Sequence, residues 1–378
     1  MRAATLAALA ALAVLGVTSA ARADRVVAVE PQLGHADVVT EVALSPDGAF
    51  AATSSDDAVI VWDTGTGMQR KLHAGRTGAF TRTPLVQFSG DGKLLLVVTS
   101  ATAIAYRVGS FEPAWSLPVR TGSSDIEPVT YSLQVSDDAE RFAYYLRKPD
   151  KSGVIVWSRQ SIEKVLTVDA ELTSIALSPA GDRAVGGTKG GDVIVWDVKT
   201  GKPTASRRFD EDVDHVAFVR DTTYVLVGAS PYVALWDPGA NEILAVNAVP
   251  ANRILAVRAA PTSSTIQVTG AVPHEDGWVF AAWTLDGTVT GRPRPWGPPR
   301  EQARLPKTPG RAMRVASATR APLVLAIADN RASLIQAKDG LVQQRLALGR
   351  VQAAPTAIGV QAALWRPSDV RSRMGIQE

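Results

Sequence analysis

The sequence predicts an all-β fold, a β-propeller of seven blades with four antiparallel strands each. The first observation is a repeat, because residues 59–63 return almost unchanged as residues 193–197 and 233–237. The second is the period: these segments and fainter copies follow one another at about 40 to 50 residues, the length of one four-stranded blade. The third is that short alternating apolar segments are separated by Gly, Pro and Asp, which is typical of strands joined by tight turns.

The first blade shows the pattern most clearly. Strands are expected over residues 38–44, 49–54, 58–63 and 68–72. The turn after the first of them is Ser-Pro-Asp-Gly, in which proline presets φ and glycine tolerates positive φ. The same order of short strands and turns is therefore expected in every later blade.

The first blade also carries a recognisable set of residues. Gly34-His35, the Ser-Pro-Asp-Gly turn, Asp56 and Trp62-Asp63 together resemble a WD40 repeat. In that family a histidine, a serine or threonine, an aspartate and a tryptophan form a hydrogen-bonded network inside the blade. Such a network would satisfy a buried imidazole and a buried indole N–H and hold the hairpins together. The resemblance implies that it consists here of His35, Ser54, Asp56 and Trp62, with Thr53 as the less favoured hydroxyl.

The remaining blades follow at the same period. Their strands are expected within residues 89–107, 136–158, 174–201, 213–237, 253–290 and 313–348. A Pro/Arg-rich inter-blade loop is predicted at residues 291–310, because its prolines are incompatible with a central strand. This loop is either a docking arm or an insertion that lies against the rim.

Two segments are left over, residues 26–30 and 355–366. WD40 precedent implies that one terminus completes a blade begun by the other, which would close the ring and remove exposed sheet edges. Residues 357–365 resemble a second and a third strand, so an eighth, incomplete blade is the alternative to seven.

The N-terminus predicts export. A short positive region at Met1-Arg2 precedes an apolar run over residues 3–17 and the small-x-small pattern Ala21-Arg22-Ala23, so residues 1–23 are expected to be a cleaved signal peptide. The apolar run is shorter than the roughly 20 residues that cross a bilayer, although an uncleaved anchor is the alternative. The mature protein is then residues 24–378, one domain, with no later membrane span. Its richness in Ala and Arg indicates a bacterium, so it is expected in the periplasm or outside the cell.

Charge and cysteine content narrow the classes of partner. The chain has 40 basic and 37 acidic residues, and without the two arginines of residues 1–23 the balance is 40 − 2 = 38 against 37. A nucleic-acid surface needs a clustered basic excess, so nucleic acid is not an expected partner. With 0 cysteines, disulfides, thiolate metal sites and a lipidated N-terminal cysteine are excluded.

A catalytic constellation is not found. The four histidines fall in different blades, no HExxH or Gly-x-Ser-x-Gly motif occurs, and the His274-Glu275-Asp276 run has poor metal-ligand spacing. The turn over residues 197–202 resembles a quinoprotein motif, but the tryptophan that should follow is missing. No catalytic residue, metal or cofactor is therefore predicted. The third-strand tryptophans are expected in the core, whereas Trp278 and Trp296 are expected to be the more exposed ones.

The predicted function is that of an exported, non-catalytic, monomeric scaffold for protein–protein interaction. The alternative is a propeller enzyme or small-ligand binder that uses the central channel, quinoprotein-like or lactonase-like. Loops that join outer to inner strands and second to third strands share one face in WD40 propellers, and aromatic and arginine residues there are typical of interface hot spots. The predicted binding face consists of Arg76, Phe80, Arg82, Lys148, Asp150, Lys151, Tyr232, His274, Glu275, Asp276, Trp278 and Arg331.

Overall fold

A computed structural model describes residues 35, 39–74, 83–99, 101–119, 133–146, 152–160, 162–259, 265–274, 277–287, 296–304, 314–318, 320–321, 323–328, 331–336 and 342–347. Within these ranges the chain forms 28 β-strands, β1 to β28. They make seven four-stranded antiparallel sheets, and the strand order in each sheet follows the chain. The predicted all-β propeller architecture is therefore confirmed.

The strands of the first four sheets have the following bounds. The first sheet contains β1 (Glu41–Leu44), β2 (Phe50–Ser54), β3 (Ala58–Asp63) and β4 (Gln69–Ala74). The second contains β5 (Leu85–Phe88), β6 (Leu94–Val98), β7 (Thr102–Arg107) and β8 (Pro113–Pro118). The third contains β9 (Leu133–Val135), β10 (Arg141–Leu146), β11 (Ser152–Ser158) and β12 (Ile162–Val168). The fourth contains β13 (Leu172–Leu177), β14 (Arg183–Thr188), β15 (Asp192–Asp197) and β16 (Pro203–Arg208).

The other three sheets repeat this order. The fifth contains β17 (His215–Phe218), β18 (Val225–Ala229), β19 (Tyr232–Asp237) and β20 (Glu242–Ala248). The sixth contains β21 (Arg253–Ala259), β22 (Thr265–His274), β23 (Gly277–Asp286) and β24 (Arg300–Arg304). The seventh contains β25 (Arg314–Ser317), β26 (Leu323–Ala328), β27 (Arg331–Gln336) and β28 (Val342–Ala347).

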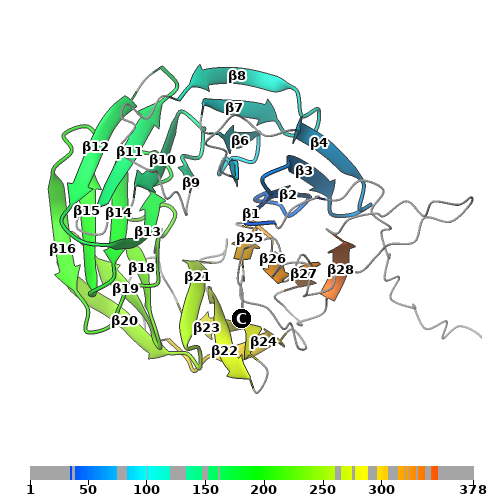
Figure 1. Cartoon of the computed structure of the whole chain (residues 1–378). Coiled ribbons are helices and arrows are strands. Elements are labelled where there is room, and N and C mark those ends of the chain that lie inside the picture. The colour runs from blue at the N-terminus through cyan, green and yellow to red at the C-terminus, as the bar shows by residue number, and fades with distance from the viewer. Residues whose placement is uncertain are drawn as a thin grey trace, which may run out of the picture.

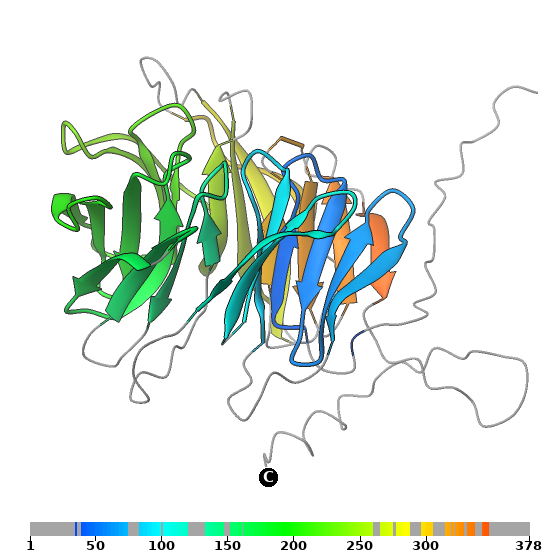
Figure 2. The ribbon, with the colours of Figure 1, turned by 90° about the horizontal axis from the view of Figure 1, so that it is seen from above.

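The sheets stand around a common centre (Figure 1). Each innermost strand lies against the innermost strands of the sheets before and after it, and β25 lies beside β1. Because the strands alternate in direction, the second–third hairpins and the connections between sheets lie at one end of the ring, which we call the upper face. The first–second and third–fourth turns lie at the other end, the lower face. Figure 2 views the ring at a right angle to Figure 1.

The first–second turns of the first three sheets share one chemistry. In the first sheet Ser45 Oγ donates to Asp47 Oδ1 at 2.6 Å, and Gly48 closes the turn with φ of 76°. The second sheet repeats this with Ser89 and Asp91 at 2.7 Å. A serine and an aspartate two residues apart thus form hydrogen bonds inside the turn. Because the turn needs these two residue types, they recur along the sequence and make the repeat visible.

Aromatic side chains of the third strands fill the spaces between sheets, as predicted. Each faces the preceding sheet: Trp62 packs in one cluster with Leu325 of the seventh sheet, and Trp283 packs with Leu226 of the fifth. The full set of buried third-strand aromatics is Trp62, Tyr106, Trp157, Trp196, Trp236 and Trp283.

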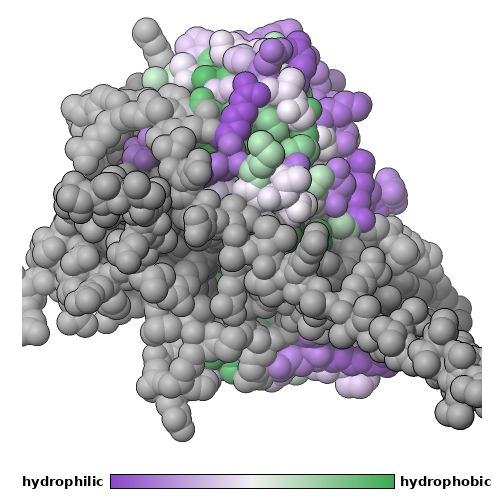
Figure 3. Space-filling view, turned by 90° about the vertical axis from the view of Figure 1, so that its right-hand side faces the viewer, coloured by the Kyte–Doolittle hydropathy of each residue, from purple (hydrophilic) through white to green (hydrophobic). Residues whose placement is uncertain are grey.

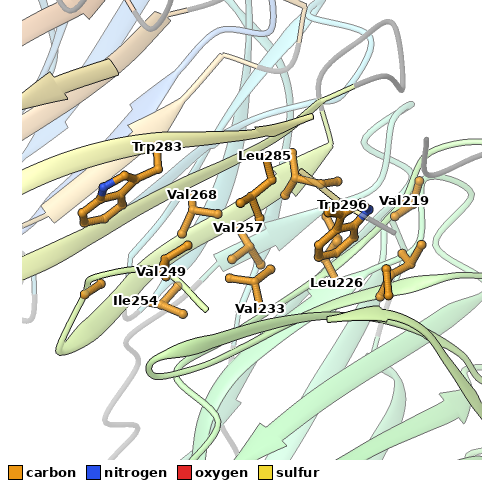
Figure 4. Packing of buried hydrophobic residues seen from close by; sticks show 14 of the residues in the cluster. Val219, Leu226, Val233, Val249, Ile254, Val257, Val268, Trp283, Leu285 and Trp296 are labelled. Carbon is orange, nitrogen blue, oxygen red and sulfur yellow. The ribbon is translucent and has the colours of Figure 1, made fainter. Parts of the chain in front are cut away.

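Trp296 is also part of the core, so its predicted exposure is wrong. Its side chain is only 7% exposed and packs between the fifth and sixth sheets with Leu226, Val233 and Val257 (Figure 4). The main chain beside it is held as well, because Asn247 Nδ2 donates to the Gly297 carbonyl oxygen at 2.7 Å. The proline-rich context suggested an exposed loop, whereas the segment docks its indole into the groove between two sheets.

The prediction of a loop over all of residues 291–310 is wrong in part, because this stretch also contains a strand. Residues 300–304 form β24, the outer strand of the sixth sheet, paired with β23. The prolines of this stretch end at Pro299 before resuming at Pro306, and an edge strand needs hydrogen bonds on one side only. The sixth sheet therefore extends beyond its predicted end at residue 290.

Several predictions fall outside the described ranges. The signal peptide, the ring-closing role of residues 26–30 and 355–366, and the alternative of an eighth blade belong to this group. In the part of the chain that is described, no helix has the length and apolar character needed to cross a membrane.

Candidate partner-binding surface

The first sheet contains a buried hydrogen-bonded network around His35. Trp62 Nε1 donates to Thr53 Oγ1 at 2.8 Å, and the same hydroxyl lies 2.7 Å from His35 Nε2. His35 Nδ1 lies 2.6 Å from Ser55 Oγ, which donates in turn to Asp57 Oδ1. The imidazole and the indole are thus both satisfied, and the segment before β1 is tied to the β2–β3 hairpin.

Two members of this network differ from the prediction, since Thr53 takes the place of Ser54 and Asp57 that of Asp56. The register explains the first correction: Trp62 pairs with Ala51, so residues 51 and 53 share its face of the sheet and Ser54 points to the other face. Ser54 Oγ is buried, and it has no hydrogen-bond partner among the described residues. Asp56 instead accepts a hydrogen bond from Thr83, ahead of β5, and so joins the first two sheets.

The corrected network makes a discriminating prediction. Thr53→Val should lower the free energy of unfolding by about 1 to 3 kcal/mol, because it leaves the buried indole and imidazole nitrogens without their partner. Ser54→Ala is the matched control and should change it by less than about 0.5 kcal/mol, since its hydroxyl has no bond to lose. Urea unfolding of both variants measures the difference. Equal losses for the two would show that Ser54 carries the bond.

The upper face holds the described members of the predicted binding set. Tyr232 opens β19 at the β18–β19 hairpin, and its side chain is 47% exposed. His274 and Trp278 belong to the β22–β23 hairpin, where His274 pairs with Gly277 and Pro273 with Trp278. Arg331 begins β27. These hairpins belong to consecutive sheets, so the fold brings four predicted residues to one side of the upper face. The rest lie outside the described ranges: Arg76, Phe80, Arg82, Lys148, Asp150, Lys151, Glu275 and Asp276.

A group of polar contacts fixes the hairpin that carries Tyr232. The sequence analysis did not predict these contacts. Ser230 Oγ donates to Asp214 Oδ2, and the Ile254 N–H donates to Ser230 Oγ at 2.8 Å. Asp214 precedes β17 and Ile254 lies in β21, so this one hydroxyl joins the fifth and sixth sheets. A similar link joins the third and fourth sheets, where the Leu172 N–H donates to Ser152 Oγ at 3.1 Å. Tyr232 is therefore presented by a braced hairpin.

The upper face also carries an acidic run between the fourth and fifth sheets. Asp210, Glu211 and Asp212 are exposed on the connection between β16 and β17, which continues into Asp214. The Phe209 N–H of this connection donates to the Gly191 carbonyl oxygen at 2.9 Å, so the acidic run passes beside the β14–β15 hairpin of the fourth sheet. The sequence signal for it is the run Asp210, Glu211 and Asp212, followed by Asp214.

The lower face is tied by contacts between sheets that are not neighbours. Arg220 of the fifth sheet pairs with Asp137 of the third, with Nη2 to Oδ1 at 2.9 Å. Arg320 of the seventh sheet donates through Nη2 to the Gly90 carbonyl oxygen of the second at 3.0 Å. A Cβ at Gly90 would lie 1.8 Å from Asp137 Oδ1, so the four turns meet at this glycine. A ligand that entered the ring from the lower face would have to displace these side chains.

The remaining described surface is mixed. Figure 3 shows hydrophilic and hydrophobic side chains interspersed over the described part of one side of the molecule. Among the described residues, no group of three or more His, Cys, Asp or Glu side chains has the geometry of a metal site.

Burial lowers the pKa of His215 to about 4, and its Nδ1 accepts a hydrogen bond from the Val257 N–H at 3.4 Å. This imidazole joins two inner strands and is neutral at pH 7.

The comparisons with known proteins agree with this architecture. Residues 29–63 match the family model for the WD domain, G-beta repeat. No curated protein matches the sequence. Many solved structures are similar in fold. A chain in the crystal structure of a mitotic checkpoint complex is 15% identical with a TM-score of 0.59, and the match covers 78% of this chain and 87% of that one. The β-propeller domain of Cps50 (Swd1) from Myceliophteria thermophila is 15% identical with a TM-score of 0.54, covering 78% and 95%. Residues 29–63, which include β1 to β3, thus match a WD40 repeat, and the ring has the fold of a β-propeller.

Proposed function

We propose that this chain is a non-catalytic scaffold that binds a protein partner through its upper face. The observation that carries the proposal is the exposed Tyr232 on a hairpin braced by Asp214 and Ser230. An aromatic side chain on a fixed backbone loses less conformational entropy on binding than one on a mobile loop, which is typical of interface hot spots. The acidic run of the upper face favours a partner with basic residues at its contact surface.

The chemistry of the buried polar groups supports the same conclusion. His35 and His215 are both engaged in hydrogen bonds that join strands. One of the similar solved chains is part of a mitotic checkpoint complex, where the fold serves in an assembly of proteins. The rival function, an enzyme or small-ligand binder in the central channel, would need reactive groups that converge there. It would be favoured if the purified protein carried a quinone or another small molecule.

Capture of the partner tests the proposal. The triple variant Arg82→Ala, Tyr232→Ala, Trp278→Ala should abolish capture of a stoichiometric partner that the wild type retains, as measured by affinity purification and mass spectrometry. The circular dichroism spectrum and melting midpoint should not change. Val246→Ala is a matched control, because Val246 is 58% exposed but lies on the outer strand β20, away from the upper face.

The proline-rich segment needs its own variant. Deleting residues 291–310 would remove Trp296 and β24 and so would disrupt the sixth sheet. Arg292→Ser with Arg294→Ser removes the two positive charges ahead of Trp296 and leaves both Trp296 and β24 in place. Loss of capture in this double variant, with capture retained in the triple variant, would assign binding to the segment and overturn the upper-face assignment.

We further propose that the protein is exported by a bacterium, that residues 1–23 are removed, and that the mature monomer closes its ring with its two termini. The basis is the charged, apolar and small-x-small order of the first residues. N-terminal sequencing of the mature protein from the periplasm or medium should begin at Asp24. Recovery of the uncut chain in a membrane fraction would instead indicate an anchor.

A further inference from the structure

The joint between the sixth and seventh sheets differs from the other six. At each of the other six joints, an aromatic residue of a third strand faces the preceding sheet. It occupies the position that Trp62 has in the first sheet, where it pairs with Ala51. In the seventh sheet the corresponding pair is Ile335 with Val324, so an aliphatic residue stands where the others have Trp or Tyr. We call this joint the sixth–seventh seam.

The sixth sheet is also unusual on its side of the seam. In each second strand, one residue pairs with the third-strand position described above, and the residue that follows it faces the next sheet. This following residue is apolar in six sheets, where it is Ala52, Leu96, Ala143, Val185, Leu226 and Leu325. In the sixth sheet it is Thr269, since Val268 pairs with Trp283. Thr269 is 2% exposed and its Oγ1 has no hydrogen-bond partner. A hydroxyl thus occupies a position that the other sheets fill with an aliphatic group.

A part-buried cation with a buried Nη1 lies on the same face of the sheet as this hydroxyl. Arg258 donates through Nε to Gln267 Oε1 at 2.9 Å and through Nη2 to the Ala321 carbonyl oxygen of the seventh sheet at 3.3 Å. Its Nη1 is buried without a partner, and the described residues supply no carboxylate to it. Burial lowers the pKa of Arg258 to about 10, so the guanidinium stays charged at neutral pH.

Arg258 and Thr269 are diagonal neighbours on one face of the sheet. Arg258 pairs with Gln267, and Ala256 pairs with Thr269. Diagonal neighbours in antiparallel strands lie roughly 7 to 8 Å apart at the backbone, within reach of a long side chain. The same face of the sheet therefore carries two donors, Nη1 and Oγ1, and the described residues supply an acceptor for neither.

We propose that the sixth–seventh seam is a binding site for an oxyanion of the carboxylate class, held by Arg258 and Thr269. A carboxylate offers two oxygens, one for the Nη1 group and one for the Thr269 hydroxyl, and it neutralises the part-buried guanidinium. An unpaired buried charge is unfavourable, as is an unpaired buried hydroxyl, so a ligand that satisfies both is bound favourably. The ligand enters by local opening of the seam, which is the joint without a third-strand aromatic to separate.

The site differs from the arginines of the lower face. Arg220 already has Asp137 as its partner, and Arg320 is bonded to main-chain oxygens on an exposed turn. Arg258 alone among these three combines a buried amino group that lacks a partner with a neighbouring unpaired hydroxyl. The proposal concerns a small anion between two sheets and is independent of protein binding at the upper face.

Thermal unfolding of the full chain in acetate tests the site, with chloride replaced at constant ionic strength. The wild-type midpoint should rise with the logarithm of the acetate concentration once this exceeds the Kd, by roughly 1 to 3 °C at a tenfold excess. Arg258→Met should abolish this rise. Arg208→Met is the matched control, since Arg208 pairs with Asp192 on the exposed rim, and it should keep the full rise. A wild type that responds equally to acetate and chloride, or an Arg258→Met variant that keeps the response, would overturn the proposal.

Thr269→Val provides a second, conservative variant. Without ligand it should melt at or above the wild-type midpoint, because it replaces an unpaired buried hydroxyl by a methyl group of the same shape. Calorimetric titration with acetate should show an affinity several-fold weaker than wild type. A marked loss of stability would mean that the hydroxyl has a partner, and tighter binding of phosphate than of acetate would contradict the carboxylate assignment.

Discussion

Replacing Trp296 by alanine is expected to lower the free energy of unfolding by about 3 to 5 kcal/mol, the range found when large buried aromatic side chains are removed. The indole fills the groove between the fifth and sixth sheets and contacts residues of both. The connection that carries it cannot collapse freely into the vacated space, because Asn247 holds the next carbonyl. Urea unfolding of the full chain measures the loss.

Two variants make this test specific. Trp296→Phe should be much milder, since Trp296 Nε1 has no hydrogen-bond partner and only part of the apolar volume is lost. Met68→Ala removes a large side chain that is 73% exposed and should change the stability by less than about 0.5 kcal/mol. If Trp296→Ala were as mild as Met68→Ala, the indole would not be buried in solution.

The architecture could be predicted because most of the sheets repeat the same local rules. A third-strand aromatic and a turn containing serine and aspartate recur at a regular period, and both are local in the sequence. Trp296 was missed because it lies in no strand and has prolines around it. Its burial depends on the groove between two sheets, which the repeat pattern does not describe.

In the first-sheet network, the predicted hydroxyl of Ser54 and the observed hydroxyl of Thr53 are only one residue apart. Side chains on a strand alternate between faces, so choosing Ser54 instead of Thr53 moves the group to the wrong side of the sheet. Pairing of Trp62 with Ala51 decides the matter, and the sequence does not state that register. The aspartate was displaced by one residue for the same reason, because the turn between β2 and β3 was placed without knowledge of its hydrogen bonds.

Contacts between distant sheets were not predictable. Arg220 and Asp137 lie on sheets that are not neighbours, and the bend of the ring brings them together. The sixth–seventh seam had a partial signal, since the last repeat has Ile335 where the others have an aromatic residue. The unpaired state of Arg258 and Thr269 becomes visible only when their neighbours are known.

The pH dependence of stability should reveal His215. Its pKa is lowered by burial to about 4 from an ordinary value near 6.5, so the unfolded chain binds a proton more readily than the folded protein between these two values. The stabilising contribution is therefore fully present above about pH 6.5 and is lost as the pH falls toward 4. A shift of this size corresponds to about 3 kcal/mol. Protonation also removes the acceptor of the Val257 N–H, which joins the inner strands of the fifth and sixth sheets.

His215→Gln isolates this contribution, because the amide cannot take up a proton in this range and retains an acceptor oxygen. Urea unfolding of both proteins at pH 7, 5.5 and 4.5 should give a variant whose stability falls less steeply, with a difference that grows toward about 3 kcal/mol as the pH approaches 4. Burial raises the pKa values of carboxylates such as Asp47 and Asp91, but hydrogen bonds to turn residues outweigh it and lower them overall. Their protonation in acid destabilises both proteins equally, so this effect cancels in the comparison. Parallel curves for the two proteins would mean that His215 titrates at its ordinary pKa and that its imidazole is open to water.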